Sequence, residues 1–199
     1  TAKIFLTRNL YLILMFIMVG FIGLPFPGQV RQLSWASFST AGIPAMLIAL
    51  EWIQPRTIWR FRRQVLGYII ISSLIGAVAV TIAYTASYLI SDHDLQLART
   101  LMTLMAVIYG TVIFWDVNGV IPFEPITFKQ NAREAIIVVL VAIVTLAVPF
   151  IFRTTFDIAV VPLPYLIGLG LLAVLANFAL WRSTLEQSSI LAPFKSLVE

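Results

Sequence analysis

Long apolar stretches separated by short polar connections make up most of the chain. Six such stretches lie near residues 4–24, 33–52, 66–90, 99–116, 134–152 and 159–181. A helix needs roughly 20 mainly apolar residues to cross about 30 Å of hydrocarbon, and each stretch reaches or approaches that length. Continuous apolar runs such as 135–151 lack the alternation of a membrane barrel strand. The pattern therefore predicts an all-α, polytopic integral membrane bundle of six transmembrane helices, forming a single domain over residues 1–199.

Composition supports a protein that lies within the lipid bilayer. Hydrophobic residues make up 60% of the chain and charged residues only 11%, with a mean hydropathy of +0.98. A soluble globule of this size could not bury so much apolar side chain. The absence of cysteine excludes disulfides and thiolate metal sites within the chain. The single histidine, His93, lies between two aspartates in a polar connection, which we interpret as a solvated loop or as a weak surface site for cations.

The basic residues predict the orientation of the helices and do not indicate a nucleic-acid partner. Cytoplasmic connections of membrane proteins carry the excess of Lys and Arg. An orientation with both termini inside places ten basic residues on the inner side and only three outside. The inner set is Lys3, Arg8, Arg56, Arg60, Arg62, Arg63, Lys129, Arg133, Arg182 and Lys195, and the outer set is Arg31, Arg99 and Arg153. We therefore expect an N-in, C-in topology.

The second predicted span contains a polar stretch with a proline. Pro44 cannot donate a hydrogen bond to the carbonyl of Thr40, and its ring crowds that carbonyl, so the helix should kink or open there. Gly42 lowers the resistance to unwinding. The freed carbonyl and the hydroxyls of Ser37, Thr40 and, less centrally, Ser39 would then supply oxygen ligands for a hard cation at membrane depth. The alternative is a structural kink in which the hydroxyls bond back to their own helix.

Asn9 brings an amide into the first span. A polar group carried into the membrane needs a partner, and an amide oxygen is a competent ligand for a hard cation. A hydrogen bond between helices is the alternative. No Asp or Glu lies in the middle of any predicted span, so a divalent cation would need acidic ligands from elsewhere.

No pattern of catalytic or cofactor-binding residues is present. The chain has no phosphate-binding GxxxxGK[ST] loop, no GxGxxG after a strand and no HExxH motif. It begins at Thr1 without a methionine and close to an apolar run, so we expect it to be part of a longer protein.

The first two spans resemble the hairpin of the fifth and sixth membrane helices of P-type cation-transporting ATPases. Residues 23–25 (Gly-Leu-Pro), Trp35 and residues 40–45 (Thr-Ala-Gly-Ile-Pro-Ala) match, without a gap, the Gly-Leu-Pro, Trp and Thr-Asp-Gly-Leu-Pro-Ala of calcium pumps in that family. The later spans are similar to the last four helices of those pumps in order and loop length. The continuation over residues 42–51 is most similar to a bacterial, calcium-pump-like branch.

The resemblance implies roles for individual residues. Asn9 and Thr40 fall on a ligating Asn and a ligating Thr, and Ser37 replaces a ligating Asn while retaining an oxygen. Two positions depart from the family pattern, since Ala41 stands where the family has a ligating Asp and Leu12 where it has a ligating Glu. The identity of the ion and the number of sites are therefore left open, although calcium is favoured.

The resemblance also implies further domains of the same protein. Cytoplasmic domains and further membrane helices upstream of Thr1 would bind Mg-ATP, form an aspartyl phosphate and drive the cation across a bacterial inner membrane. Two other classes of protein fit a chain of six spans if the resemblance is set aside. One is a channel or membrane scaffold that is complete as given and has no enzymatic activity. The other is an ion-coupled secondary transporter, which the lack of acidic residues inside the spans disfavours.

Overall fold

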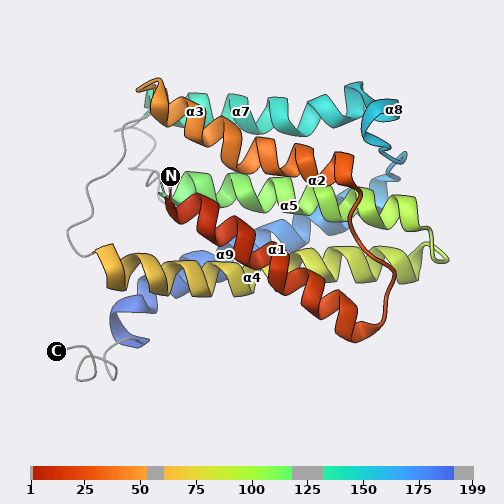
Figure 1. Ribbon diagram of the computed structural model, residues 1–199, viewed down its shortest axis with the longest axis horizontal. Helices are drawn as coiled ribbons and strands as arrows, with labels where there is room; N and C mark the ends of the chain where they lie inside the picture. The colour runs from red at the N-terminus through yellow and green to blue at the C-terminus, as the bar shows by residue number, and fades with distance from the viewer. Residues whose placement is uncertain (1, 53–60, 118–131, 191–199) are drawn as a thin grey trace.

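The computed structural model describes residues 2–52, 61–117 and 132–190, and every regular element in these ranges is helical. The helices lie side by side in one bundle (Figure 1). They are α1 (Ala2–Ile22), α2 (Val30–Ser37), the π-helical turn η1 (Phe38–Gly42), α3 (Ile43–Ala49), α4 (Phe61–Ile90), α5 (Leu95–Val117), α7 (Ala132–Ile151), α8 (Arg153–Phe156) and α9 (Leu163–Ile190). The predicted all-α class is thus confirmed for the described part of the chain.

Four helices of the described part are long and apolar enough to cross a membrane. Their candidate spans are Lys3–Ile22, Leu66–Ile90, Leu95–Val117 and Leu163–Ser183. α7 contributes the shorter apolar segment Ile136–Ile151. The remaining predicted span, near 33–52, is divided among α2, η1 and α3.

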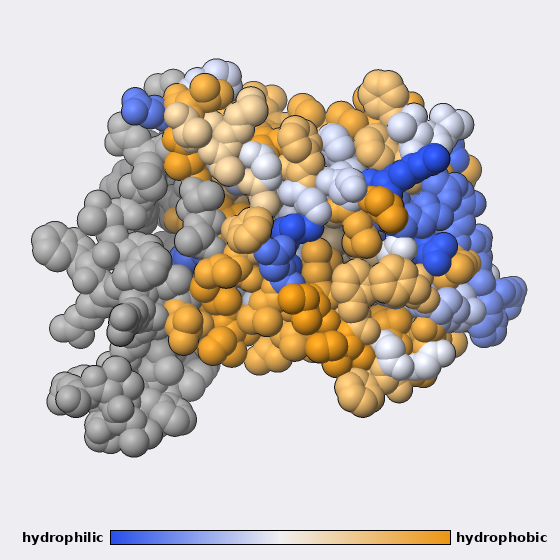
Figure 2. All heavy atoms as spheres, viewed as in Figure 1, coloured by the Kyte–Doolittle hydropathy of each residue, from blue (hydrophilic) through white to orange (hydrophobic). Residues whose placement is uncertain are grey.

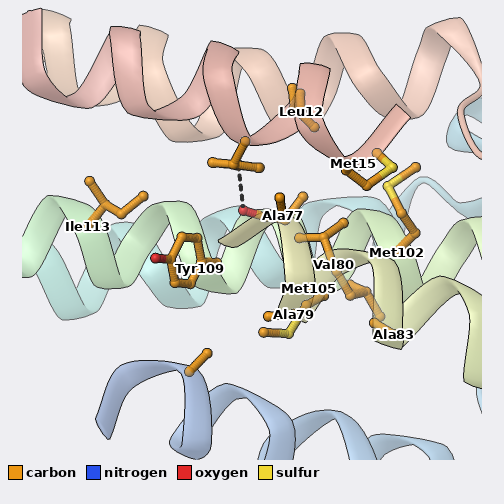
Figure 3. Close-up of a cluster of buried hydrophobic side chains, with 14 of the residues drawn as sticks. Leu12, Met15, Ala77, Ala79, Val80, Ala83, Met102, Met105, Tyr109 and Ile113 are labelled. Carbon is orange, nitrogen blue, oxygen red and sulfur yellow. Dashed lines mark hydrogen bonds between the residues drawn. The ribbon is translucent and has the colours of Figure 1, made fainter. Parts of the chain in front are cut away.

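α5 lies at the centre of the bundle. It packs against α1, α2, η1, α4, α7 and α9, and 78% of the residues in its most apolar window are buried, against 17% for α9. Side chains from α1, α4 and α5 meet there, with Met15 of α1 facing Met102 of α5 (Figure 3). The outer helices instead expose leucine, isoleucine and valine, as a surface in contact with lipid requires.

Small residues and tyrosine hydroxyls join the central helices. A Cβ added at Gly76 of α4 would lie 2.3 Å from the Tyr109 ring, so the glycine makes room for that tyrosine. The Tyr109 hydroxyl then donates to the Ser72 carbonyl at 2.6 Å. The Tyr11 hydroxyl donates to the Ala106 carbonyl at 3.2 Å. In an apolar medium these buried hydroxyls need such partners, which also fix the position of α1 and α4 on α5.

The connections 23–29, 91–94 and 152–162 gather at one end of the bundle (Figure 1). The connected helices therefore alternate in direction. This end also carries hydrophilic surface, whereas the middle of the same face is mostly apolar (Figure 2).

A polar cluster closes this end. The Asp157 carboxylate accepts hydrogen bonds from the Gln29 and Gln96 side-chain amides, both at 2.6 Å. The fully buried Gln32 amide donates to the Asp157 carbonyl at 3.0 Å. Asp157 has a φ of 54°, a left-handed conformation that ends α8 and turns the chain toward α9. We refer to Gln29, Gln32, Gln96 and Asp157 as the Asp157 clamp, which ties α2, α5 and the α8–α9 connection together.

Several boundaries differ from the predicted spans. α4 begins at Phe61, before the predicted 66, and α5 begins at Leu95, before the predicted 99. The sixth span was predicted from 159, but α9 begins at Leu163. Pro162 cannot continue a helix on its N-terminal side, and its carbonyl accepts the first hydrogen bond of the new helix from Tyr165 at 3.1 Å. The predicted loop 153–158 contains the one-turn helix α8.

Candidate cation site at the broken helix

The second predicted span departs from α-helical geometry where the proline was expected to open it. Over Phe38–Gly42 the backbone forms a π-helical turn, and the Ile43 N–H donates to the Phe38 carbonyl five residues back. Pro44 falls in the first turn of α3, where a backbone N–H is not needed. The predicted span thus departs from α-helical geometry here, but as a π turn within a continuous helix and not as an open break. The free carbonyl expected at Thr40 stays a prediction.

Gly42 acts through the space it leaves. Its φ of −65° and ψ of −54° are helical, so the chain is not unwound at this residue. A Cβ added at Gly42 would lie 3.0 Å from the Phe38 ring, closer than such contacts normally come. The glycine therefore gives room to an aromatic ring one turn earlier.

The three hydroxyls of this segment each donate to a carbonyl of their own helix. Ser37 donates to the Leu33 carbonyl at 2.6 Å. Ser39 and Thr40 both donate to the Ala36 carbonyl, at 3.2 and 2.5 Å. This is the arrangement that the structural alternative expected. Each oxygen keeps lone pairs that can accept a hydrogen bond or contact a cation.

Thr40 is the residue of η1 that contacts the central helix, α5. Ser39 and Thr40 are both buried. A Cβ added at Gly110 of α5 would lie 2.3 Å from Thr40 Cγ2 and 2.6 Å from its Cβ, so Thr40 rests directly on the glycine. Gly110 thus fixes how closely the π turn approaches α5.

Asn9 and Ser37 are brought together through Arg8. The Arg8 Nη1 donates to the Asn9 Oδ1 at 3.0 Å, and its Nη2 donates to the Ser37 Oγ. All three side chains are half-buried between α1 and α2. On the face formed by these helices, Figure 2 shows a small hydrophilic patch within the apolar middle of the bundle. The structure thus joins Asn9 to Ser37 through Arg8 and packs Thr40 against α5, with no contact between Thr40 and this pair among those described.

The donor set of the site consists of neutral oxygens. Within the described ranges no group of three or more His, Asp or Glu could hold a metal ion. Leu12, at one of the two positions where the resembling family has a carboxylate, is buried in the core (Figure 3). Hydroxyl, amide and carbonyl oxygens suit a hard cation but do not neutralise a divalent one. Acidic ligands would have to come from outside the described residues.

Sequence reasoning missed two residues of this site. Arg8 was assigned only to topology, although a charged side chain inside an apolar span is itself a signal of function. Gly110 gave no signal, because it belongs to no motif and its partner Thr40 lies far away in the sequence.

Comparison with known proteins adds no relative. No family model, no curated protein and no solved structure matches the chain. A functional assignment must therefore depend on the residues and on the geometry described above.

Proposed function

We propose that this chain is the membrane transport domain of a P-type ATPase that moves a hard cation, calcium favoured. Hydrolysis of Mg-ATP by cytoplasmic domains outside the chain would supply the energy. The observation that carries this proposal is the π-helical turn at Phe38–Gly42, which coincides with the segment where the sequence resembles the ligand helix of these pumps.

The turn has the properties that a cation site inside a bundle needs. It interrupts the regular hydrogen-bond ladder between helical segments, and π turns in helices are frequent at functional sites. It buries Ser39 and Thr40, and it packs the Thr40 side chain against Gly110 of α5. Ser37, directly before the turn, is bonded to Arg8 of α1, which also bonds Asn9. Asn9, Ser37 and Thr40, with Ser39 beside them, are the ligands we assign to the cation.

The proposal includes six spans with both termini inside, in a bacterial inner membrane. α2, η1 and α3 contain 8, 5 and 7 residues, together 20, which would form one interrupted span. α7 has 20 residues and would form another. At 1.5 Å per residue a 20-residue helix is about 30 Å long, the thickness of the hydrocarbon core. Upstream helices of the same protein would complete the site and supply the carboxylates missing from it.

Phosphorylation of the intact parent protein tests the proposal. A P-type ATPase carries an Asp-Lys-Thr-Gly motif and forms an acid-stable aspartyl phosphate from ATP, and we expect both. The Thr40→Val variant keeps the shape of the side chain but loses the oxygen. In this variant, half-maximal formation of the phosphoenzyme should require a cation concentration on the order of tenfold higher or more. Loss of a group around a bound metal typically weakens metal affinity on that scale. Thr40→Ser, which retains the hydroxyl, is the matched variant, and it should raise the required cation concentration much less than Thr40→Val does. A parent protein without the motif would refute the proposal.

A second candidate function has its own observation. Because Ser37, Ser39 and Thr40 all donate to their own helix, the break also fits a six-span channel or scaffold with no pump activity. A channel predicts cation flux that does not depend on ATP, and a scaffold predicts no flux. Thr40→Val should change neither outcome.

A further inference from the structure

Arg8 lies inside the first candidate span, Lys3–Ile22, next to Asn9 on α1. A basic side chain near a helix end commonly extends to the membrane surface. The Arg8 guanidinium instead turns between two helices, where Nη1 is bound to Asn9 and Nη2 to Ser37. Its Nε is buried and has no hydrogen-bond partner among the described residues.

The acceptors of Arg8 are two of the predicted cation ligands. A guanidinium is permanently charged and has only donors, so it binds the same oxygen lone pairs that a metal cation would use. The Ser37 hydroxyl donates its hydrogen to the Leu33 carbonyl at 2.6 Å, so its lone pairs remain to accept from the guanidinium. A second cation held by the same oxygens would also lie within a few ångströms of the Arg8 charge and be repelled by it.

We propose that Arg8 is a tethered cation that occupies the Asn9–Ser37 pair and must leave it before the transported cation binds there. The inference rests on the proposed function and names the residue that regulates access to that site. In the described conformation the Arg8 guanidinium occupies the oxygens of Asn9 and Ser37, so a metal cation cannot bind to them. Arg8 thereby sets the cation concentration at which the site fills.

The position of Ser37 provides a way to release the guanidinium. Ser37 is the last residue of α2, directly before the π turn. A π turn that reverts toward α-helical geometry rotates the preceding helix relative to the following one. Such a rotation moves Ser37 away from α1 while Asn9 and Arg8 stay together on their own helix.

Binding of Mn²⁺ and Ca²⁺ to the intact protein tests the inference. Arg8→Met removes the charge and retains an unbranched apolar stem. If Arg8 occupies the pair nine-tenths of the time, its removal lowers the apparent dissociation constant about tenfold. Mn²⁺ binding is measured by electron paramagnetic resonance, and the half-saturating Ca²⁺ concentration is measured by stimulation of ATP hydrolysis. Arg8→Lys keeps a cation at this position and should strengthen binding less than Arg8→Met does.

Arg31→Met is the matched control, because it removes the same charge from an exposed arginine near the outer end of the bundle. It should leave both constants unchanged. Arg8→Met that binds Mn²⁺ no better than the wild type while remaining folded by thermal unfolding would overturn the inference, and so would an absence of Mn²⁺ binding in both proteins. Arg8 would then be a static link between α1 and α2.

The two readouts separate this inference from the proposed function. Tighter Mn²⁺ binding in Arg8→Met without cation-stimulated ATP hydrolysis in either protein supports the tethered cation and refutes the pump. Cation-stimulated hydrolysis with the same half-saturating Ca²⁺ concentration in both proteins supports the pump and refutes the tethered cation.

Discussion

Thr40 and Gly110 illustrate how single residues position the candidate site. The glycine lies on the most buried helix of the bundle, and the threonine lies on the π turn that packs against it. Because the contact is made at the Cβ and Cγ2 of Thr40, its hydroxyl is free to bond the Ala36 carbonyl at 2.5 Å. One hydrogen atom in place of a methyl group on α5 therefore sets the depth of a predicted ligand.

We expect Gly110→Ala to destabilise the chain by about 1–3 kcal/mol, the usual cost of overpacking a close contact. The added Cβ would lie 2.3 Å from Thr40 Cγ2, so η1 must move away from α5. Unfolding in mixed micelles, followed by circular dichroism, measures the loss. Gly20→Ala in α1 is the control, since an added Cβ there meets nothing within 4 Å.

Rescue by Thr40→Ser identifies the contact responsible. Serine lacks the Cγ2 methyl group, the nearer of the two atoms that the new Cβ would strike, and keeps the Cβ, which would lie 2.6 Å away. In the double variant the cost of Gly110→Ala should therefore be smaller than in the single variant. Equal costs in both backgrounds would contradict the assigned contact.

Part of the site was predictable at this scale. The polar run and Pro44 identified Ser37, Ser39 and Thr40 as a distinctive segment because such residues are unusual in an apolar span. The role of Arg8 depends on Ser37, which lies 29 residues away and on another helix. Such a contact is a property of packing, and no local pattern encodes it.

The broken helix and the Asp157 clamp are the two features of interest at the scale of elements. α2 is held at its N-terminal end by Gln29 and Gln32, and at its C-terminal end it continues into the π turn. The clamp fixes one end of this helix against α5 and the α8–α9 connection. A rotation of α2 at the π turn must therefore work against the clamp.

Asp157→Asn should lower the unfolding free energy by about 1–3 kcal/mol, because an asparagine has one oxygen for the two glutamine amides and lacks the charge that strengthens both bonds. Asparagine also tolerates the left-handed backbone of this residue, so strain is not added. Asp92→Asn is matched in chemistry and backbone, since Asp92 has a φ of 51° but is exposed. Urea or detergent titration of both variants measures the difference. Equal stabilities would show that the clamp does not stabilise the fold.

Hydropathy predicted the helices but not how they are divided. The apolar lengths located every long helix to within a few residues at most ends. Pro44 predicted that the second span would depart from α-helical geometry, yet the choice between a kink and a π turn depends on the packing of Phe38 and Thr40. The short helix α8 was missed because its end depends on the clamp, which joins residues as far as 128 positions apart.

At the scale of the whole molecule, one buried helix is surrounded by helices with apolar outer surfaces. The central position of α5 was not predicted, because the hydropathy of a segment tells how apolar a helix is but not which other helices cover it. The alternation of the connections was predicted, and the gathering of 23–29, 91–94 and 152–162 at one end agrees with it (Figure 1).

The proposed orientation predicts which positions are reached from outside the cell. The chain has no cysteine, so single cysteines can be introduced without competing sites within it. Thr154→Cys on exposed α8 should react with a membrane-impermeant maleimide in intact cells. Glu51→Cys, exposed beyond the end of α3, should react only after the membrane is opened. Reaction of both from the same side would contradict the six-span topology.

The most direct test of the account is ATP-driven movement of Ca²⁺ by the intact protein in sealed vesicles, measured beside Mg²⁺, Mn²⁺, K⁺ and Na⁺. We predict transport of at least one hard cation that requires ATP and that falls on the order of tenfold or more in Asn9→Leu and in Thr40→Val, each of which removes an assigned ligand oxygen. Cation flux that proceeds without ATP, or ATP-driven transport that both variants leave intact, would contradict the account.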